Sequence, residues 1–229
     1  MSEEKTVYLI RHAQSEQNIQ LGRVKNGEYI AGLFGAAMIG LDAPLSDHGK
    51  KQLLTANLKL KTRDWIPSSS SYSPKPELIV HSPYIRAKDT AVGIFNSCPL
   101  SSSMLELPWF HERTLFEYIP YLGYIPFDTR IQQTNDWLKT RQEKTIAMVG
   151  HGQLFKRWLN APHSPANVEA LECVWSPENG GKIWIKEDGK ARICLASSQG
   201  QGNKSTDISI DAPAPNHNPA PAPAGPVMT

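Results

Sequence analysis

Three short apolar segments of this 229-residue chain, residues 6–10, 77–81 and 145–149, end in arginine or histidine or are closely followed by them. The side chains concerned are those of Arg11, His12, His81, Arg86 and His151. Arginine binds phosphoryl oxygens in a bidentate manner and keeps its charge. A neutral histidine can attack phosphorus directly. These residue types therefore indicate phosphoryl chemistry.

The elements that carry these residues predict an α/β fold. The three segments are continuously apolar, which is typical of parallel strands buried on both faces by helices. The pattern predicts helices over 47–61, with Ser46 as N-cap, and over 84–95, 130–141 and 153–160. Residues 182–186 and 191–195 flank turn-forming residues and predict a hairpin. We expect a three-layer sandwich with a mainly parallel central sheet flanked by helices.

In such a sheet, ligands bind at the carboxyl ends of the strands. If the three apolar strands are neighbours, their arginines and histidines meet in one cleft. Helix N-termini that point into the cleft would add backbone donors and positive potential. The sequence has no Walker-type glycine loop and no D-x-D cluster that would hold Mg²⁺. We therefore expect no metal and no cofactor.

Composition excludes several classes of protein. The 24 Lys+Arg residues against 22 Asp+Glu give a net charge of +2, too balanced for a nucleic-acid binder or a polybasic membrane binder. The three cysteines form no C-x-x-C pair, which excludes a cysteine zinc site. The longest apolar run, residues 30–41, is too short to cross a bilayer. Acids near the start do not suit a signal peptide, so we expect a cytoplasmic protein.

The chain divides into a folded part and a tail. We expect one domain over residues 1–199, with a glycine-rich loop insertion over 19–44 and a Ser/Pro loop over 67–76. The apolar part of the insertion is expected to pack as a loop, and the insertion as a whole could act as a lid over the site. Residues 200–229 are rich in proline and alanine and predict a disordered tail.

Four segments resemble, in order, the signatures of the histidine phosphatase superfamily, which has the phosphoglycerate-mutase-like fold. They are LIRHAQSEQN (9–18), DAPLSDHGKKQ (42–52), SPYIRAKDTA (82–91) and AMVGHG (147–152). This resemblance implies that His12 is the nucleophile that becomes phosphohistidine. It also implies that Arg11, Arg86 and His151 form the phosphate pocket, with Asn18 as an extra donor. Gly152 resembles the mutase and phosphatase branch, because acid phosphatases carry aspartate at this place.

The general acid has two candidates in residues 109–118 (WFHERTLFEY). Glu117 resembles the acid of the family's phosphatases and is our first choice. Glu112 resembles, more faintly, the acid of the mutases, although no tyrosine-glycine follows the H-E-R triplet. Either acid would protonate the leaving alcohol and then accept a proton from the attacking water.

Two positions in the first signature depart from the family. Ala13 stands where glycine is usual and Gln14 where an acid is common. A Cβ at residue 13 narrows the pocket, and the loss of an acid leaves the pocket more positive. His81 stands just before the S-P dipeptide, where we expect a packing residue rather than a catalytic one.

The resemblance implies a metal-independent phosphatase that hydrolyses a phosphate monoester, either a small phosphorylated molecule or a phosphopeptide. Nucleic acid and membranes are not expected partners, and the oligomeric state stays open. One alternative is a phosphoglycerate-type mutase, which must keep its phosphoenzyme away from water. Another is a weakly active module that only binds phosphorylated ligands.

Overall fold

The computed structural model describes residues 3–32, 42–61, 76–96, 104–112, 127–186 and 192–194. All of them belong to one compact unit, Met1–Ser198. Outside the described residues lie the predicted tail over 200–229, the predicted loop over 67–76 except its last residue, and the acid candidate Glu117. The predictions for these parts therefore stay predictions.

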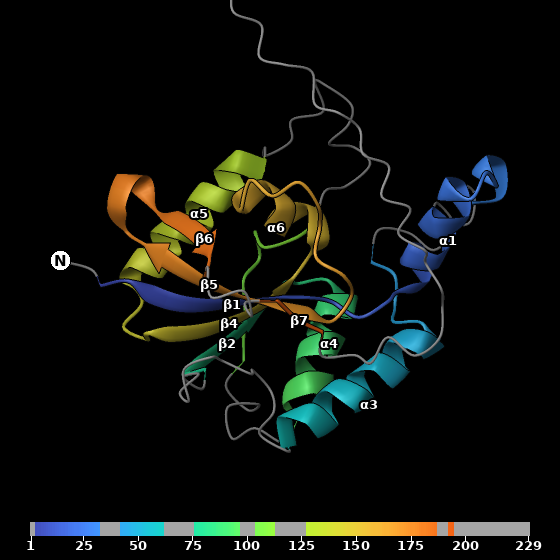
Figure 1. Cartoon of the computed structure of the whole chain (residues 1–229), viewed down its shortest axis with the longest axis horizontal. Helices are drawn as coiled ribbons and strands as arrows, with labels where there is room; N and C mark the ends of the chain where they lie inside the picture. Colours follow the sequence, from blue (N-terminus) through green and yellow to red (C-terminus); the bar gives the residue numbers. More distant parts are fainter. Residues whose placement is uncertain are drawn as a thin grey trace, which may run out of the picture. The chain divides into compact units, whose positions relative to one another are not determined.

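The described strands form one mixed sheet in the order β3-β2-β4-β1-β5-β6 (Figure 1). The parallel part consists of β1 (Lys5–Arg11), β2 (Leu78–His81), β3 (Leu105–Glu106) and β4 (Thr145–Gly150). The antiparallel part adds β5 (Glu169–Ser176), which pairs with β1. The three apolar segments are therefore adjacent strands in the order β2-β4-β1, which meets the condition under which their ends converge.

The predicted hairpin is wrong in its pairing, although both of its strands exist. β6 (Lys182–Ile185) pairs with Cys173–Ser176 of β5, and β7 (Arg192–Cys194) pairs with Glu169–Leu171 of the same strand. The two short strands thus follow each other along one edge of β5 and run in the same direction. The turn-forming residues between the two segments indicate that the segments pair with each other. They do not indicate that both segments can pair with the longer strand β5 instead.

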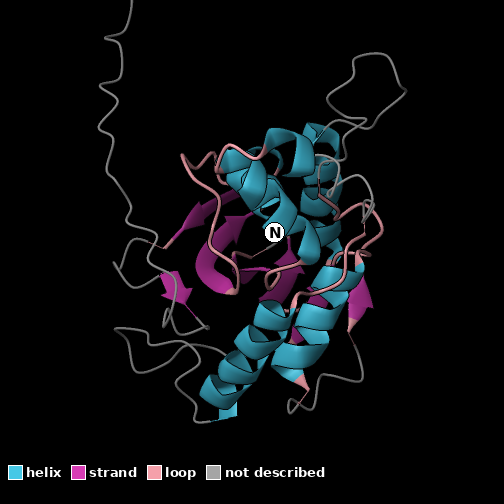
Figure 2. Ribbon diagram, turned by 90° about the vertical axis from the view of Figure 1, so that its right-hand side faces the viewer, coloured by secondary structure: helices cyan, strands magenta, loops and turns pink. Residues whose placement is uncertain are grey.

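Helices cover both faces of the sheet (Figures 1 and 2). On one face lie α5 (Phe127–Thr140) and α6 (Gly152–Trp158), and on the other α3 (Asp47–Lys61) and α4 (Ile85–Phe95). In β1, Val7 and Leu9 pack in the core cluster that includes α5 and α6, whereas Tyr8 and Ile10 pack in the cluster that includes α3 and α4. Both faces of this strand are apolar because both are buried. The expected three-layer α/β sandwich is confirmed.

One further helix, α1 (Glu16–Lys25), occupies the start of the stretch over 19–44 that we expected to be a loop insertion. Its N-terminus is a reciprocal cap, in which Ser15 Oγ accepts from Asn18 N–H (3.3 Å) and Asn18 Oδ1 accepts from Ser15 N–H (3.1 Å). The sequence of α1, EQNIQLGRVK, has no regular apolar spacing that predicts a helix. None of the described helices is long and apolar enough to cross a membrane.

Candidate active site

The carboxyl ends of the parallel strands meet at one edge of the sheet. In the register of β1 and β4, Arg11 lies beside Gly150. His12 and His151, the next residues, therefore come together, with ring centroids 5.2 Å apart at an interplanar angle of 63°. Both side chains are buried, at 2% and 0% exposure. The predicted convergence of the two histidines is confirmed.

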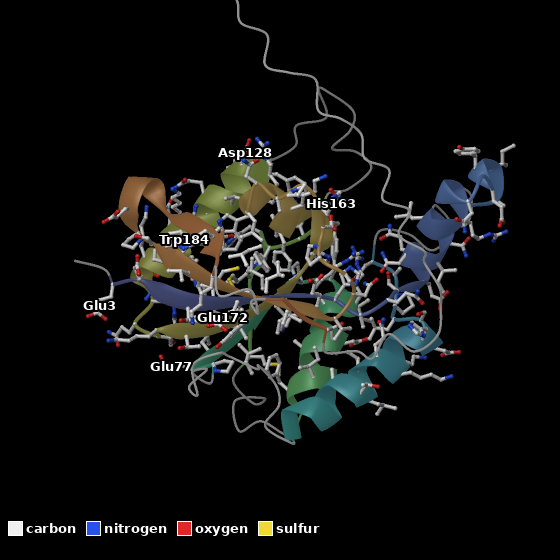
Figure 3. The ribbon with its side chains drawn as sticks, viewed as in Figure 1. Glu3, Glu77, Asp128, His163, Glu172 and Trp184 are labelled. Atoms are coloured by element: carbon white, nitrogen blue, oxygen red, sulfur yellow. The ribbon has the colours of Figure 1, made fainter. Side chains whose placement is uncertain are left out.

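The opposite edge of the sheet has a different character. Glu3 and Glu77, both labelled in Figure 3, lie at the amino ends of β1 and β2. Lys144 joins them: its Nζ lies 2.7 Å from Glu3 Oε2, and its N–H donates to Glu77 Oε2 (2.8 Å). The Glu3–Lys144 pair is exposed and stabilises little. The buried rings of His12 and His151 lie at the carboxyl edge, together with buried Arg86 and half-buried Arg11.

His12 is held in one tautomer. Its Nδ1 lies 2.7 Å from the carbonyl oxygen of Ala13, which can only accept a hydrogen bond, so Nδ1 carries the proton. Nε2 then carries the lone pair. Burial, followed by the charges of Arg86 and Arg11, holds the pKa of His12 well below its ordinary value. At neutral pH the ring is therefore uncharged, with the lone pair on Nε2.

His151 is also neutral. Burial is the main cause that holds its pKa well below the ordinary value, followed by the charge of Arg86. Its Nε2 lies 2.7 Å from Ser82 Oγ, which also accepts from Tyr84 N–H (3.3 Å). If the Ser82 hydroxyl donates to Nε2, the ring proton lies on Nδ1. This buried atom has no hydrogen-bond partner among the residues that the structure describes, so it can donate to a bound anion.

Arg11 lies extended beside the start of α6. Its Nη1 donates to Pro165 O (2.7 Å), while its buried Nε has no hydrogen-bond partner within the described ranges. A Cβ added to Gly152 would come within 3.1 Å of this Nε and within 3.1 Å of Ser164 Cβ. Gly152 thus leaves the room that Arg11 needs, and an aspartate at this place would crowd the guanidinium.

Arg86 reaches the site from the first turn of α4 and is only 2% exposed. Its guanidinium carbon lies 4.6 Å from the centre of the Tyr84 ring, and Nη1 lies 3.9 Å from Asp42 Oδ1. The same carboxylate oxygen accepts from Ile85 N–H (2.7 Å) and so caps α4. Burial lowers the pKa of Arg86, whereas the carboxylate of Glu112 raises it. Asp42 thus anchors both the helix and its arginine.

Of the two acid candidates, Glu112 is the one that the structure describes. It is half-buried, and its Oε2 accepts from Gln153 N–H at the start of α6 (3.4 Å). Burial lowers the pKa of Arg11 and that of Arg86, and the negative charge of Glu112 raises both. A carboxylate therefore lies close enough to both arginines to act on them.

Two contacts that the sequence analysis missed connect the signatures to one another. Ala13 N–H donates to Thr90 Oγ1 (2.9 Å), and the Thr90 hydroxyl donates to Arg86 O (2.6 Å). Thr90 thus joins the residue after His12 to the helix that carries Arg86. No periodicity of the sequence points to this contact, because Thr90 and Ala13 lie 77 positions apart.

The first turn of α3 packs directly on the loop after His12. Ser46 Oγ accepts from Gly49 N–H (3.1 Å), which confirms Ser46 as the N-cap, and donates to Gln14 Oε1 (2.9 Å). A Cβ on Gly49 would lie 2.0 Å from Gln14 O, so this close approach requires glycine. Ser46 and Gly49 therefore hold the start of α3 against the loop.

Other histidines have different surroundings. His81 is buried, with Nδ1 2.9 Å from Ser82 O, in agreement with a packing residue. His111 accepts from Arg130 Nη1 (2.5 Å) and lies with its ring centre 5.8 Å from that of Tyr84. Within the described ranges, no group of three or more His, Cys, Asp or Glu residues could hold a metal ion.

Comparisons with solved structures agree with this fold. Phosphoglycerate mutase from Bacillus anthracis superposes with a TM-score of 0.54 at 14% sequence identity, over 83% of this chain and 95% of that one. A mycobacterial glucosyl-3-phosphoglycerate phosphatase in complex with inorganic phosphate superposes with a TM-score of 0.51 at 15% identity, over 84% and 100% of the two chains. No protein-family model matches the sequence, and no curated protein does.

At these low identities, the likeness shows the fold. The strand order, the helices on both faces and the histidines at the carboxyl edge are features of this chain's own structure. The chain has the phosphoglycerate-mutase-like fold.

Proposed function

We propose that this protein hydrolyses a phosphate monoester through a phosphohistidine formed on His12. The observation that carries the proposal is the tautomer of His12. Its Nδ1–H is engaged by Ala13 O and its Nε2 lone pair is available, while burial, followed by the charges of Arg86 and Arg11, lowers its pKa. A buried, neutral imidazole flanked by two arginines is suited to attack a phosphoryl group that those arginines bind.

In the first step, His12 Nε2 donates its lone pair to phosphorus, and the bond between phosphorus and the ester oxygen breaks. Arg11 and Arg86 bind the equatorial oxygens, as charge moves onto them in the transition state. His151 Nδ1–H and Asn18 Nδ2 donate further hydrogen bonds. Asn18 Oδ1 already accepts from Ser15 N–H, which leaves the amino group of this side chain for the phosphate.

A carboxylic acid gives its proton to the leaving alcohol in the first step. In the second, a water attacks phosphorus, the carboxylate accepts the water's proton, and the bond to Nε2 breaks. This releases inorganic phosphate and returns His12 to its neutral state. Glu117 remains the acid that the family resemblance favours. Glu112 has the support of its influence on both arginines.

Two single substitutions separate these acids. The replacement of the true acid, Glu117→Gln or Glu112→Gln, should slow the hydrolysis of an alkyl phosphate far more than that of nitrophenyl phosphate, since nitrophenolate leaves without protonation. The other substitution should affect both esters equally. An equal effect of Glu117→Gln on the two esters, with a selective effect of Glu112→Gln, would make Glu112 the acid.

The substrate class is a small phosphorylated molecule or a phosphopeptide. The pocket specifies the phosphoryl group, whereas leaving-group recognition belongs to the surrounding loops. A phosphoglycerate-type mutase is the second candidate, because one of the similar solved folds is such a mutase. Transfer of ³²P between phosphoglycerates that is faster than phosphate release would favour the mutase over the hydrolase.

The test of the proposal uses the purified full chain, nitrophenyl phosphate and EDTA. We expect turnover that EDTA does not reduce and that His12→Ala abolishes. His163→Ala is the matched control, because His163 is exposed beyond α6 (Figure 3) and should leave turnover unchanged. Loss of activity with EDTA would contradict metal independence. Binding of orthophosphate with no hydrolysis of any ester would leave a phosphate-binding module instead of an enzyme.

A further inference from the structure

The segment 165–168, just before β5, is bonded to Arg11 and His12 at three points. Pro165 O accepts from Arg11 Nη1 (2.7 Å), and Val168 N–H donates to Arg11 O (3.0 Å). Asn167 Nδ2 donates to His12 O (2.8 Å), across 155 positions of sequence. Both the side chain and the main chain of the Arg-His pair are therefore held from this segment.

Asn167 also fixes the orientation of Asn18. Its Nδ2 donates to Asn18 Oδ1 (3.3 Å), the oxygen that also accepts from Ser15 N–H (3.1 Å). Since two N–H donors face that oxygen, the Asn18 amide is held in one orientation, and its Nδ2 is the half that can donate to an anion. The Asn167 amide thus contacts both the main chain of His12 and the side chain of Asn18, which is a candidate hydrogen-bond donor to phosphate.

The backbone beside Asn167 has an uncommon conformation. Val168 has φ of +57° and is completely buried, although β-branched residues strongly disfavour this region. Such a conformation is unfavourable and persists only where its surroundings impose it. Here the bond to Arg11 O and the turn from Glu169 N–H to Ala166 O (3.1 Å) impose it. The turn sends the Val168 side chain into the core and the Asn167 amide towards His12.

We infer that Asn167 is a positioning residue for phosphoryl transfer, acting through His12 and Asn18 without touching the phosphoryl group. The inference rests on the proposed function. Asn167 keeps the nucleophile loop and the Asn18 amide in place before substrate arrives, so that neither has to be ordered on binding.

The test compares Asn167→Ala, Asn167→Asp and Asn167→Ser with the control Asn160→Ala. Asn160 is exposed and also has a positive φ, but none of the side-chain hydrogen bonds of the described residues involves it. For each variant, kcat and KM for nitrophenyl phosphate are measured, together with the Kd of orthophosphate by calorimetry and the melting temperature.

We expect Asn167→Ala to weaken orthophosphate binding and to lower kcat/KM by roughly tenfold, the effect of losing one to two hydrogen bonds. Asn167→Asp should be worse although it has the same shape, because a carboxylate would face two oxygen acceptors. Asn167→Ser keeps a donor and should lie between wild type and Asn167→Ala. In combination with Asn18→Ala, the loss of phosphate affinity from Asn167→Ala should be less than additive, since part of it acts through the Asn18 amide.

An unchanged phosphate Kd in folded Asn167→Ala would overturn the inference, and so would losses equal to those of Asn160→Ala or strict additivity with Asn18→Ala. If Asn167→Ala does not fold, Asn167→Ser carries the comparison with Asn160→Ala. A wild-type protein that binds orthophosphate but hydrolyses no ester would contradict the proposed function, while the phosphate affinities of the variants would still test Asn167.

Discussion

At the residue scale, the central feature is a pair of buried histidines whose pKa values are both held well below the ordinary range. For both, burial is the largest cause and the charge of Arg86 is the next. Besides burial, the same guanidinium that would bind phosphate thus helps to keep His12 unprotonated before the substrate arrives. A histidine that must act as a nucleophile needs this neutral state.

The removal of this charge should move the titration of His12. In Arg86→Gln, the pKa of His12 should rise, because a like charge no longer opposes protonation of the ring. The acidic limb of the kcat/KM profile should therefore shift to higher pH, together with a general loss of activity from weaker phosphate binding. NMR titration of the His12 ring in the free protein would measure the shift directly.

Arg157→Gln is the matched control for this experiment. Arg157 is exposed on α6 and pairs with Asp128 of α5, which is labelled in Figure 3, at 2.9 Å. This substitution should leave the titration of His12 in place. An acidic limb that stays unmoved in Arg86→Gln would show that Arg86 does not set the protonation of His12.

The residues at the strand ends could be predicted from the sequence, but the hydrogen bonds that hold them could not. Arg11, His12 and His151 were predictable because apolar strands buried on both faces must end at one edge, where their polar followers meet. Thr90 and Asn167 were not, because each acts on a residue 77 or 155 positions away. A single side chain at that separation leaves no periodicity in the sequence.

At the element scale, three separate parts of the chain hold the loop after β1 by hydrogen bonds. They are the N-cap of α3, helix α4 through Thr90, and the segment before β5 through Asn167. The boundaries of the helices and strands that were predicted agree with the structure within a few residues, since they depend on local periodicity, whereas α1 was missed. The pairing of β6 and β7 with β5 was not predicted, because it depends on the length of a strand elsewhere in the chain.

Gly49 tests how closely α3 must approach this loop. Gly49→Ala should destabilise the protein by about 1–3 kcal/mol, because its Cβ would lie 2.0 Å from the backbone oxygen of Gln14 and force the loop to move. The gain from alanine's helix propensity, at most about 1 kcal/mol, does not offset this. Since Gln14 follows the His12-Ala13 pair, kcat should fall as well. Urea denaturation and steady-state kinetics measure the two effects.

Gly22→Ala provides the comparison, because Gly22 lies in α1 and nothing lies within 4 Å of an added Cβ. It should stabilise the protein slightly and leave kcat unchanged. A Gly49→Ala variant that behaved like Gly22→Ala would mean that the loop after β1 tolerates displacement by α3.

At the scale of the whole molecule, the depressed histidine pKa values link stability to pH. The unfolded chain binds a proton at each histidine near pH about 6.5, whereas folded His12 and His151 resist protonation. Their contribution is fully present above that pH and is lost as the pH falls towards the folded pKa. The free energy of unfolding should therefore decrease below pH about 6.5, by up to roughly 1.4 kcal/mol per pH unit for each histidine.

Urea denaturation at several pH values between about 7.5 and 5, above the range where most carboxylates titrate, measures this slope. His12→Gln should flatten it, because the variant no longer has that ionisable ring, and exposed His163→Gln should not. Equal slopes in the wild type and His12→Gln would contradict a depressed pKa for His12.

The central claim is that the phosphoryl group is carried by His12 Nε2, since Nδ1 is occupied by the carbonyl of Ala13. The most direct measurement is to quench turnover in alkali, where phosphohistidine survives, and to locate the phosphoryl group by mass spectrometry and ³¹P NMR. We expect Nε2-phosphohistidine at residue 12, absent from His12→Ala. A phosphoryl group on Nδ1 or on another residue would contradict it, and so would turnover by His12→Ala.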